Sequence, residues 1–317
     1  MLLIVAALAF ALVCGANDGA ALLALNLNDR LVRPLRALVV LSALVVVGPL
    51  LFGTGVATTL VRRLVAFEGD TGRSALLVAV FASVVVIFVL QRRALPTSLT
   101  LALTGGIVGA GVGSGLPIGW DAVMLTLAVG ALAPFASGAI AFLGQRLLPL
   151  VPRRGRLNTR LAVLRSGSFV LQCLAYAAND AQKMLAVLAV ATGSMASGRP
   201  PQPLELLAIG ALFLLGTLLG IERSGAAYGG RVAPPRPAQA AIAEFSSAVA
   251  VFAGAAFGAP VSMTQSTTAA LVGAGASAAY RQVRWGQASR IVVAWIVTLP
   301  ASVILGALLA AVAGGAG

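Results

Sequence analysis

Long segments without any charged residue divide this sequence. They are residues 37–61, 94–120, 122–145, 245–280 and 291–317. A helix needs about 20 apolar residues to cross the hydrocarbon core of a bilayer. Since 59% of the chain is hydrophobic and only 10% is charged, its surface cannot be that of a water-soluble domain. The sequence therefore predicts an all-α, polytopic membrane protein.

The basic residues are best explained by membrane topology. The net charge is +13, but the arginines gather in short loops between apolar segments, where basic residues fix the orientation of a membrane protein. We therefore expect no nucleic acid as a partner. The first 15 residues resemble the core of a signal peptide, but they lack a basic start and lead into a polar motif that recurs later. We expect them to form the first span of the mature protein.

Residue types that are absent or rare exclude several kinds of site. The chain has no histidine, which removes histidine-based zinc sites and most general-base hydrolases. Cys14 and Cys173 lie in apolar segments and form no disulfide framework of the secreted type. We expect neither a catalytic residue nor a resident cofactor.

The chain contains two copies of one structural unit. GAND at 15–18 returns as AAND at 177–180, and ALPTSLT at 94–100 returns as GAPVSMT at 258–264. Chance similarity between apolar segments does not explain a matched Asn-Asp pair and a matched Pro-x-Ser-x-Thr in the same order. We expect a first transmembrane repeat at 1–145, a cytoplasmic linker at 146–160 and a second transmembrane repeat at 161–317.

The arginine distribution indicates that the repeats are inverted. If each copy crosses the membrane about five times, the loops on one side hold 16 arginines, and the other side holds Arg62, Arg63, Arg73 and Arg199. The positive-inside rule places the richer side in the cytoplasm and both termini outside. An odd number of spans per copy makes the copies inverted, as in many secondary transporters.

An Asn-Asp pair interrupts an apolar span in each copy: Asn17 with Asp18, and Asn179 with Asp180. An ionised Asp at mid-membrane costs about 2.5 to 3.5 kcal/mol, so we expect both to have a function. A simple ion pair with Lys183, three residues further on, would explain Asp180 but not Asp18. Small neighbouring residues would let each helix unwind and turn its carbonyl and carboxylate groups toward one point.

Each copy also carries a Pro-x-Ser-x-Thr segment with a glycine-rich tail. Proline followed by hydroxyl groups at a helix start leaves N–H and side-chain donors at one helix N-terminus, which suits an anion. Irregular backbone at membrane depth must be buried in protein or line a watery cavity, so each segment is predicted to form a helical hairpin or a broken span. The expected oxyanion ligands are Ser98, Thr100, Ser262 and Thr264. The alternative interpretation of these segments is that their small residues only allow helices to pack closely, without binding an anion.

Together these motifs resemble the signatures of the inorganic phosphate transporter (PiT) family. GAND, AANDAQK and the two PxSxT segments carry the resemblance, with the YGGRVAPP loop, the AEF that holds Glu244, and AWIVTLPAS at 294–302. The resemblance implies a symporter of inorganic phosphate with sodium or protons in the cell membrane. It further implies a homodimer that works by alternating access, with a broken helix and a helical hairpin in each repeat.

The resemblance also assigns roles by position. It places the coupling ion at Asn17, Asp18, Asn179 and Asp180, with the two aspartates as ligands if the ion is sodium. It places substrate binding at Ser98, Thr100, Ser262, Thr264, Gln265 and Lys183. Glu244 is a weaker candidate, because its position near a span end allows it to reach the cytoplasmic interface.

Three departures from the family pattern leave alternatives open. Leu99 and Met263 replace a threonine, Leu101 and Gln265 replace a histidine, and Ala21 replaces an asparagine. Fewer hydroxyl and amide groups remain, so a sulfate permease of the same family is one alternative. The other is an intramembrane hydrolase that uses Asp18 and Asp180 as paired carboxylates. This chain lacks the sequence context of intramembrane aspartyl proteases, and a hydrolase would leave the duplicated hairpins unexplained.

Overall fold

The computed structural model describes residues 1–26, 33–92, 97–150, 157–194, 199, 201–228 and 236–314. Within these ranges the regular elements are helical, apart from one antiparallel bridge between Val65 and Ile118. The all-α prediction is confirmed.

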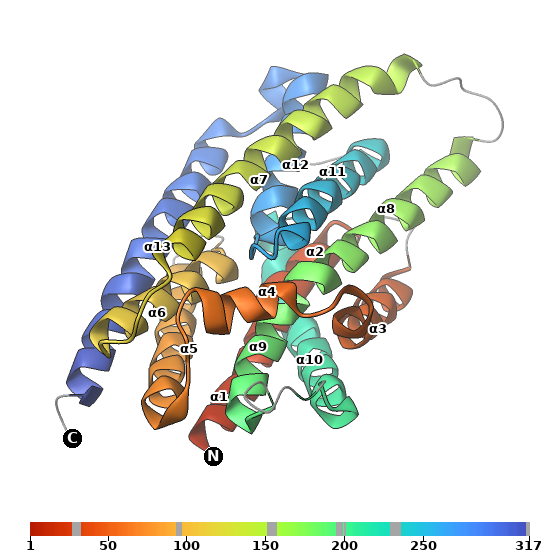
Figure 1. Cartoon of the computed structure of the whole chain (residues 1–317). Coiled ribbons are helices and arrows are strands. Elements are labelled where there is room, and N and C mark those ends of the chain that lie inside the picture. Colours follow the sequence, from red (N-terminus) through yellow and green to blue (C-terminus); the bar gives the residue numbers. More distant parts are fainter. Residues whose placement is uncertain are drawn as a thin grey trace.

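The helices of the two halves follow one another in the same order (Figure 1). The first half contains α1 (Leu2–Cys14), the π-helical turn η1 (Gly15–Gly19), α2 (Ala20–Ala24), α3 (Pro34–Phe52), α4 (Gly55–Thr58), η2 (Thr59–Arg63), α5 (Gly69–Arg92), α6 (Leu99–Gly113), α7 (Trp120–Leu147) and η3 (Leu148–Leu150). The second half contains α8 (Leu157–Asn179), α9 (Ala181–Thr192), α10 (Pro203–Tyr228), α11 (Pro237–Ala256), α12 (Met263–Ala278), η4 (Tyr280–Gln282) and α13 (Trp285–Gly314).

Within the described ranges, eight helices are long and apolar enough to cross a membrane. They are formed by α1–α2, α3, α5, α7, α8–α9, α10, α11 and α13. α6 and α12, with 15 and 16 residues, are shorter than the roughly 20 residues that a full span needs. α6 packs against α5 and α12 packs against α11, so each short helix is one arm of a helical hairpin. Each half thus has four long helices and one short arm.

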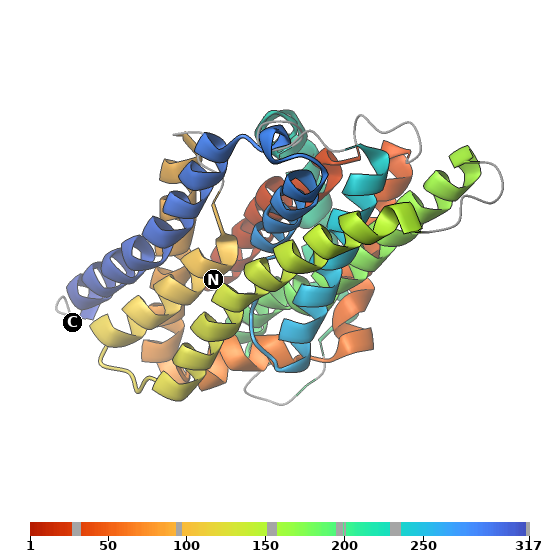
Figure 2. The ribbon, with the colours of Figure 1, turned by 90° about the horizontal axis from the view of Figure 1, so that it is seen from above.

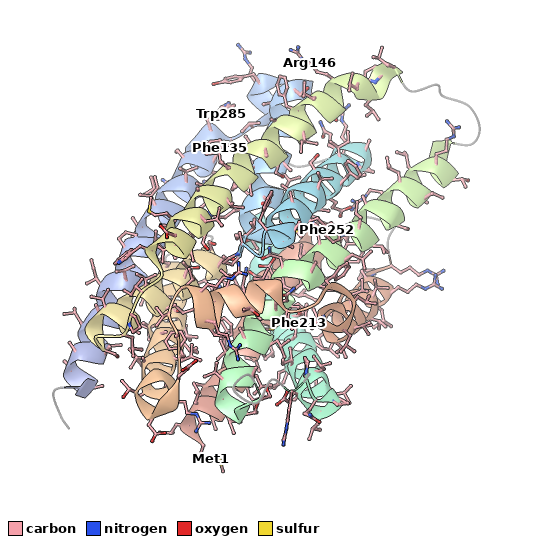
Figure 3. All side chains as sticks on the ribbon, in the orientation of Figure 1. Met1, Phe135, Arg146, Phe213, Phe252 and Trp285 are labelled. Atoms are coloured by element: carbon pink, nitrogen blue, oxygen red, sulfur yellow. The ribbon has the colours of Figure 1, made fainter. Side chains whose placement is uncertain are left out.

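The outer surface is apolar, as a lipid-facing surface must be. Phe135 is 76% exposed and projects from α7, whereas Phe213 is fully buried in the interior (Figure 3). Arg146 and Trp285 lie at one end of the molecule and Met1 lies near the other (Figure 3). Of the predicted linker 146–160, residues 146–150 continue the helical path of α7, residues 157–160 begin α8, and residues 151–156 lie outside the described ranges.

Corresponding helices of the two halves exchange partners. α6 packs along α13 and α12 packs along α7, while α1 packs against α10 and α8 packs against α3 (Figures 1 and 2). Gly109 of α6 and Gly273 of α12, which the repeat aligns, both make this exchange possible. A Cβ atom on Gly109 would overlap the carbonyl oxygen of Val303 in α13, and a Cβ atom on Gly273 would overlap that of Gly138 in α7. The two aligned glycines therefore allow the same close helix contact in both halves of the protein.

Each Asn-Asp pair lies at a break in a helix. The GANDG segment forms the π-helical turn between α1 and α2, and Asp180 separates α8 from α9. The backbone does not unwind as far as expected, since Gly19 and Asp180 keep right-handed helical dihedral angles. A π-helical turn inserts one residue into a helix and is frequent at functional sites. The predicted broken helix is therefore present in each repeat as a local interruption, and the backbone is not unwound there.

Candidate functional site

The N-termini of α6 and α12 meet in the interior of the protein. Ser98 caps α6 by accepting a hydrogen bond from the Leu101 N–H at 3.2 Å, and Ser262 caps α12 by accepting one from the Gln265 N–H at 3.4 Å. The Ser98 hydroxyl also donates to Gln265 Oε1 at 3.3 Å, so the two segments touch. Two helix N-termini at one place supply N–H groups and two positive dipole ends. This arrangement suits an anion.

Lys183 of α9 connects the two N-termini. Its Nζ donates to the Thr100 hydroxyl of α6, to Asp180 Oδ1 at 2.5 Å and to the Val261 carbonyl oxygen at 3.0 Å. The Thr100 hydroxyl also lies 3.3 Å from the Val261 carbonyl oxygen, to which it donates. Lys183 is 1% exposed and is the one lysine of the chain. Its ammonium group is thus fixed where α6, α9 and the α11–α12 hairpin come together.

Asn179 holds the tip of the α11–α12 hairpin. Its amide nitrogen donates to the Ala259 carbonyl oxygen at 2.9 Å, and its Oδ1 accepts from the Val261 N–H at 3.0 Å. Donor and acceptor of this side chain are both used by the hairpin backbone. Asn179 therefore positions the residues that lead into Ser262 and α12.

Asp18 approaches the site from the break between α1 and α2. It accepts a hydrogen bond from Asn17 Nδ2 at 2.6 Å, and Gln91 at the end of α5 donates to Asn17 Oδ1 at 2.7 Å. Asp18 is close enough to Asp180 and Lys183 to interact with both charges. Among the described residues, however, Lys183 forms its ion pair with Asp180 and not with Asp18. The site thus holds two carboxylates and one ammonium group.

The structure brings all the sequence-predicted site residues together, and all of them are buried. The hairpin segments contribute Ser98, Thr100, Ser262, Thr264 and Gln265, and the broken helices contribute Asn17, Asp18, Asn179, Asp180 and Lys183. The hydroxyls of Ser262 and Thr264 lie 3.0 Å apart. Pro96, at the start of the first Pro-x-Ser-x-Thr segment, lies outside the described residues.

Several polar residues around the site were not among the predicted site residues. Gln182, which belongs to the AANDAQK motif, accepts hydrogen bonds from the Val56 and Ala57 N–H groups, so it caps α4. The Thr97 hydroxyl and Asp180 Oδ2 are buried and have no hydrogen-bond partner among the described residues. Such atoms are costly unless water or a ligand satisfies them. Thr97 could have been found from its place inside the motif, beside Ser98, whereas nothing in the sequence connects Gln91 with Asn17.

A second cluster of buried charges lies apart from the anion site. Arg165 of α8 donates to Glu244 Oε2 of α11 at 2.6 Å and to Asn26 Oδ1 at 2.7 Å. Ser168 donates to Glu244 Oε2 at 2.6 Å, and Asn26 donates to Glu244 Oε1 at 3.1 Å. The expectation that Glu244 reaches the cytoplasmic interface is wrong. Its side chain is fully buried because Arg165 compensates its charge inside the protein.

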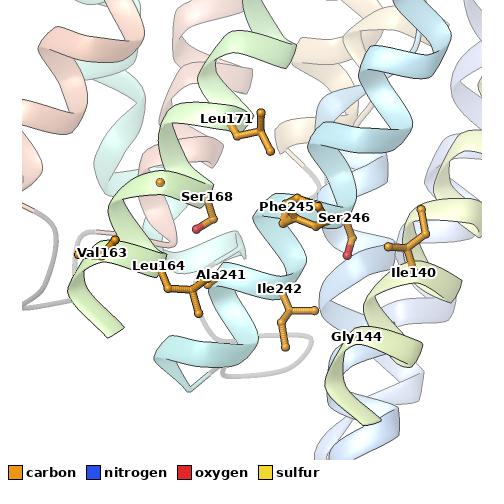
Figure 4. Close-up of a pocket in the computed structure, with 11 residues that line it drawn as sticks. Ile140, Gly144, Val163, Leu164, Ser168, Leu171, Ala241, Ile242, Phe245 and Ser246 are labelled. Carbon is orange, nitrogen blue, oxygen red and sulfur yellow. The ribbon is translucent and has the colours of Figure 1, made fainter. Parts of the chain in front are cut away.

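A cavity of about 570 Å³ lies between α7, α8 and α11, beside the second cluster (Figure 4). Its lining includes Ile140, Leu164, Leu171 and Phe245, with Ser168 and Ser246 as the polar residues. Among the described residues no charged side chain lines it, so this cavity does not suit an inorganic anion.

Comparisons with known proteins agree with this geometry. A model of the family described as "Phosphate transporter family" matches residues 14–164 and residues 151–306. A "Probable low-affinity inorganic phosphate transporter" of Rhizobium meliloti is 30% identical, over 96% of this chain and 94% of the relative. A protein of Bacillus subtilis with the same description is 25% identical, over 97% and 95%.

A solved structure has the same fold. It is entitled "The sodium-dependent phosphate transporter" and matches with a TM-score of 0.83, at 18% identity, over 98% of each chain. The proteins found are transporters and not enzymes. The hydrolase alternative that used Asp18 and Asp180 is therefore set aside.

Proposed function

This chain belongs to the phosphate transporter family, and we propose that it carries inorganic phosphate across the cell membrane together with a coupling cation. The observation that carries the proposal is the meeting of two helix N-termini at Lys183. Phosphate would bind there through the hydroxyls of Ser98, Thr100, Ser262 and Thr264, the amide of Gln265 and the ammonium group of Lys183. Serine and backbone donors at a helix N-terminus form a common type of phosphate site.

The charges of the site favour coupling to a cation. Phosphate carries up to two negative charges near neutral pH, and the site already holds Asp18 and Asp180 against one Lys183. Like charges a few ångströms apart in a low-dielectric interior repel strongly. Because Lys183 compensates Asp180, we propose Asp18 as the main ligand of the coupling cation. Carboxylate and carbonyl oxygens at the π-helical turn are ligands that hard cations prefer.

Sodium and protons are both candidates for this cation. The similar solved structure is that of a sodium-dependent protein by its title, which favours sodium. A proton on Asp18 would also reduce the repulsion, so the two cations need to be separated by experiment.

We propose that the two halves are inverted repeats that operate by alternating access. In Figure 1, α1 rises from the N-terminus toward α2, whereas α8 descends toward α9 at the same end as the N-terminus. These two corresponding helices run in opposite directions in this view, which supports an inverted arrangement like that of many secondary transporters. A homodimer, a cytoplasmic position of the arginine-rich side and an external position of both termini stay predictions.

Uptake of radiolabelled phosphate into proteoliposomes tests this function. A sodium gradient and a pH gradient are imposed separately, with protein-free liposomes as the control. We expect one of the two gradients to drive accumulation above equilibrium. Equal uptake with and without gradients would refute coupling, and no uptake above the control would refute phosphate transport. Labelled sulfate in the same assay tests the alternative of a sulfate permease.

A further inference from the structure

Buried polar side chains form a stripe along one face of α8 and α9. The stripe begins in the anion site and leads away from it. Its residues are Lys183, Asn179, Tyr176, Gln172, Ser168 and Arg165, and all are buried. Their spacing of three or four residues places them on one side of the helix. In a membrane-spanning helix, polar side chains of this kind face protein or water. The stripe leads from the site to the end of α8 that follows the arginine-rich linker.

Threonines of α12 continue from the site in the same direction. Thr264 belongs to the site, and with Thr267 and Thr268 it lines a cavity of about 10 Å³ between α12 and α2, which is about enough for one water molecule. Gln172 of the stripe donates to the Thr267 hydroxyl at 2.9 Å. The lining furthest along both helices is Leu25, which directly follows α2, and Leu271 of α12. The threonine side of this small void thus leads from the site to two leucines.

The second charge cluster lies immediately beyond these leucines. Arg165 donates to the Leu25 carbonyl oxygen at 3.4 Å as well as to Asn26 and Glu244. The cluster thereby ties the end of α2 to α8 and α11. The repeat aligns Arg165 with Leu3 and Glu244 with Val80, so the shared fold does not require these charges. Apolar residues often replace a buried ion pair without loss of stability, which points to a role other than stability.

We infer that the polar face of α8 and the threonines of α12 form the route between the anion site and the arginine-rich side. The Arg165–Glu244 pair, with Leu25 and Leu271 behind it, is the gate that closes this route. The inference rests on the proposed transport function. It assigns the gate to contacts between α2, α8, α11 and α12 that must separate once in every transport cycle.

Cross-linking across the gate tests whether these contacts separate. Leu25→Cys and Leu271→Cys are combined in a chain whose Cys14 and Cys173 are replaced by alanine, and a short bifunctional thiol reagent is applied. With a bis-methanethiosulfonate as the reagent, which forms two disulfides, we expect about a tenfold or greater loss of phosphate uptake, reversed by a reductant, because a closed gate blocks alternating access. Undiminished uptake by the fully cross-linked protein would overturn the inference.

The matched control is a cross-link that does not cross the gate. Val65→Cys and Ile118→Cys join the two segments of the isolated bridge, both within the first half. We expect uptake to survive this cross-link. Loss of uptake in both proteins would show that any cross-link stops the protein, and would remove the support for the gate.

Thiol accessibility tests the route without relying on transport. Gln172→Cys lies on the polar stripe, and Ala178→Cys is a control that is equally buried but faces another side of α8. Glu244→Gln removes the ion pair, so we expect a water-soluble thiol reagent to modify Gln172→Cys about tenfold faster and Ala178→Cys no faster. An unchanged rate at Gln172→Cys, or an equal increase at both positions, would overturn the inference.

A milder variant covers the case in which Glu244→Gln does not fold. Asn26→Ala removes the hydrogen bonds that join Asn26 to Arg165 and Glu244 but keeps the ion pair. For this variant we expect the rate of thiol modification at Gln172→Cys to increase about threefold. A folded Asn26→Ala protein without any increase would count against the gate. If wild-type proteoliposomes take up no phosphate, the proposed function fails, while the accessibility assay still decides whether this route opens.

Discussion

Lys183 and Asp180 form a buried ion pair with 2.5 Å between Nζ and Oδ1, and the described part of the first half has no equivalent of it. Asp18 occupies the same place in the first repeat as Asp180 in the second, but the residue three positions further on is Ala21. The two aspartates are therefore matched in sequence and differ in their electrostatic partner. Their substitutions should have different consequences.

Asp18→Asn should abolish accumulation of phosphate while leaving the fold intact. The asparagine carbonyl can still accept the hydrogen bond that Asn17 donates to Asp18, and no ion pair among the described residues is broken. The charge that attracts the coupling cation is lost. Gradient-driven uptake and thermal unfolding in detergent check the two expectations. A variant that accumulates phosphate like the wild type would remove Asp18 from the coupling site.

Asp180→Asn should abolish uptake and also destabilise the protein. It leaves the ammonium group of Lys183 buried without its carboxylate, and breaking one side of a buried ion pair typically costs about 3 to 5 kcal/mol. Thermal unfolding should therefore occur at a lower temperature than in Asp18→Asn. The double variant Asp180→Asn with Lys183→Met should recover stability but not uptake. Equal stability of the two single aspartate variants would contradict this account.

Gly109→Ala should destabilise the contact between α6 and α13. The added methyl group overlaps the Val303 carbonyl oxygen, and overpacking of this kind costs about 1 to 3 kcal/mol. Gly167→Ala is the matched control, since a Cβ atom there meets nothing within 4 Å and alanine favours a helix by up to about 1 kcal/mol. The temperature of thermal unfolding should be lower than in the wild type for Gly109→Ala and should not be lower for Gly167→Ala. A stable Gly109→Ala protein would mean that α6 and α13 can move apart at little cost.

The repeat explains why much of the site could be predicted from sequence. Asp18 and Asp180, or Ser98 and Ser262, stand out because each recurs at the same place in an apolar background. The glycine-rich tail after each Pro-x-Ser-x-Thr segment likewise indicated two equivalent segments, which form α6 and α12. What the repeat could not give was which helices exchange partners, because that depends on side-chain shape across the interface.

The Arg165–Glu244 pair shows where sequence reasoning ended. The two residues are far apart in the chain, occur in the second half only, and follow closely in sequence on arginine-rich loops, where a charge is unremarkable. Their burial depends on α2, α8 and α11 meeting at one point, which no local pattern encodes. The rule that intramembrane charges are functional by default would have singled them out only if the helix ends had been placed correctly.

The two sides of the membrane can be assigned by labelling. Cysteines at position 154, within the predicted cytoplasmic linker, and at Gly69, at the start of α5, are placed singly in a chain lacking Cys14 and Cys173. An impermeant maleimide should label them from opposite sides, with position 154 reached from the cytoplasm, because the arginine-rich loops stay inside. Labelling of both from one side would contradict the inverted arrangement.

Discrimination between phosphate and sulfate should depend on Asp180. The two anions have similar size and shape, so N–H and O–H donors at the helix N-termini cannot separate them well. Hydrogen phosphate retains a proton to donate, whereas sulfate does not. Asp180 Oδ1 is engaged by Lys183, while Oδ2 is buried without a partner among the described residues. Sulfate would leave this acceptor unsatisfied, and a site built around a substrate hydroxyl can discriminate by up to about 10⁴ to 10⁵.

Competition for labelled phosphate uptake measures this discrimination. Arsenate, which carries the same proton, should compete at concentrations similar to that of phosphate, whereas a large excess of sulfate should leave uptake unchanged. The control is uptake in the presence of chloride at equal ionic strength, since salt alone screens the charges around the entrance. If sulfate competes as well as arsenate, the Asp180 carboxylate does not contact the anion, and a sulfate permease becomes the better description of this chain.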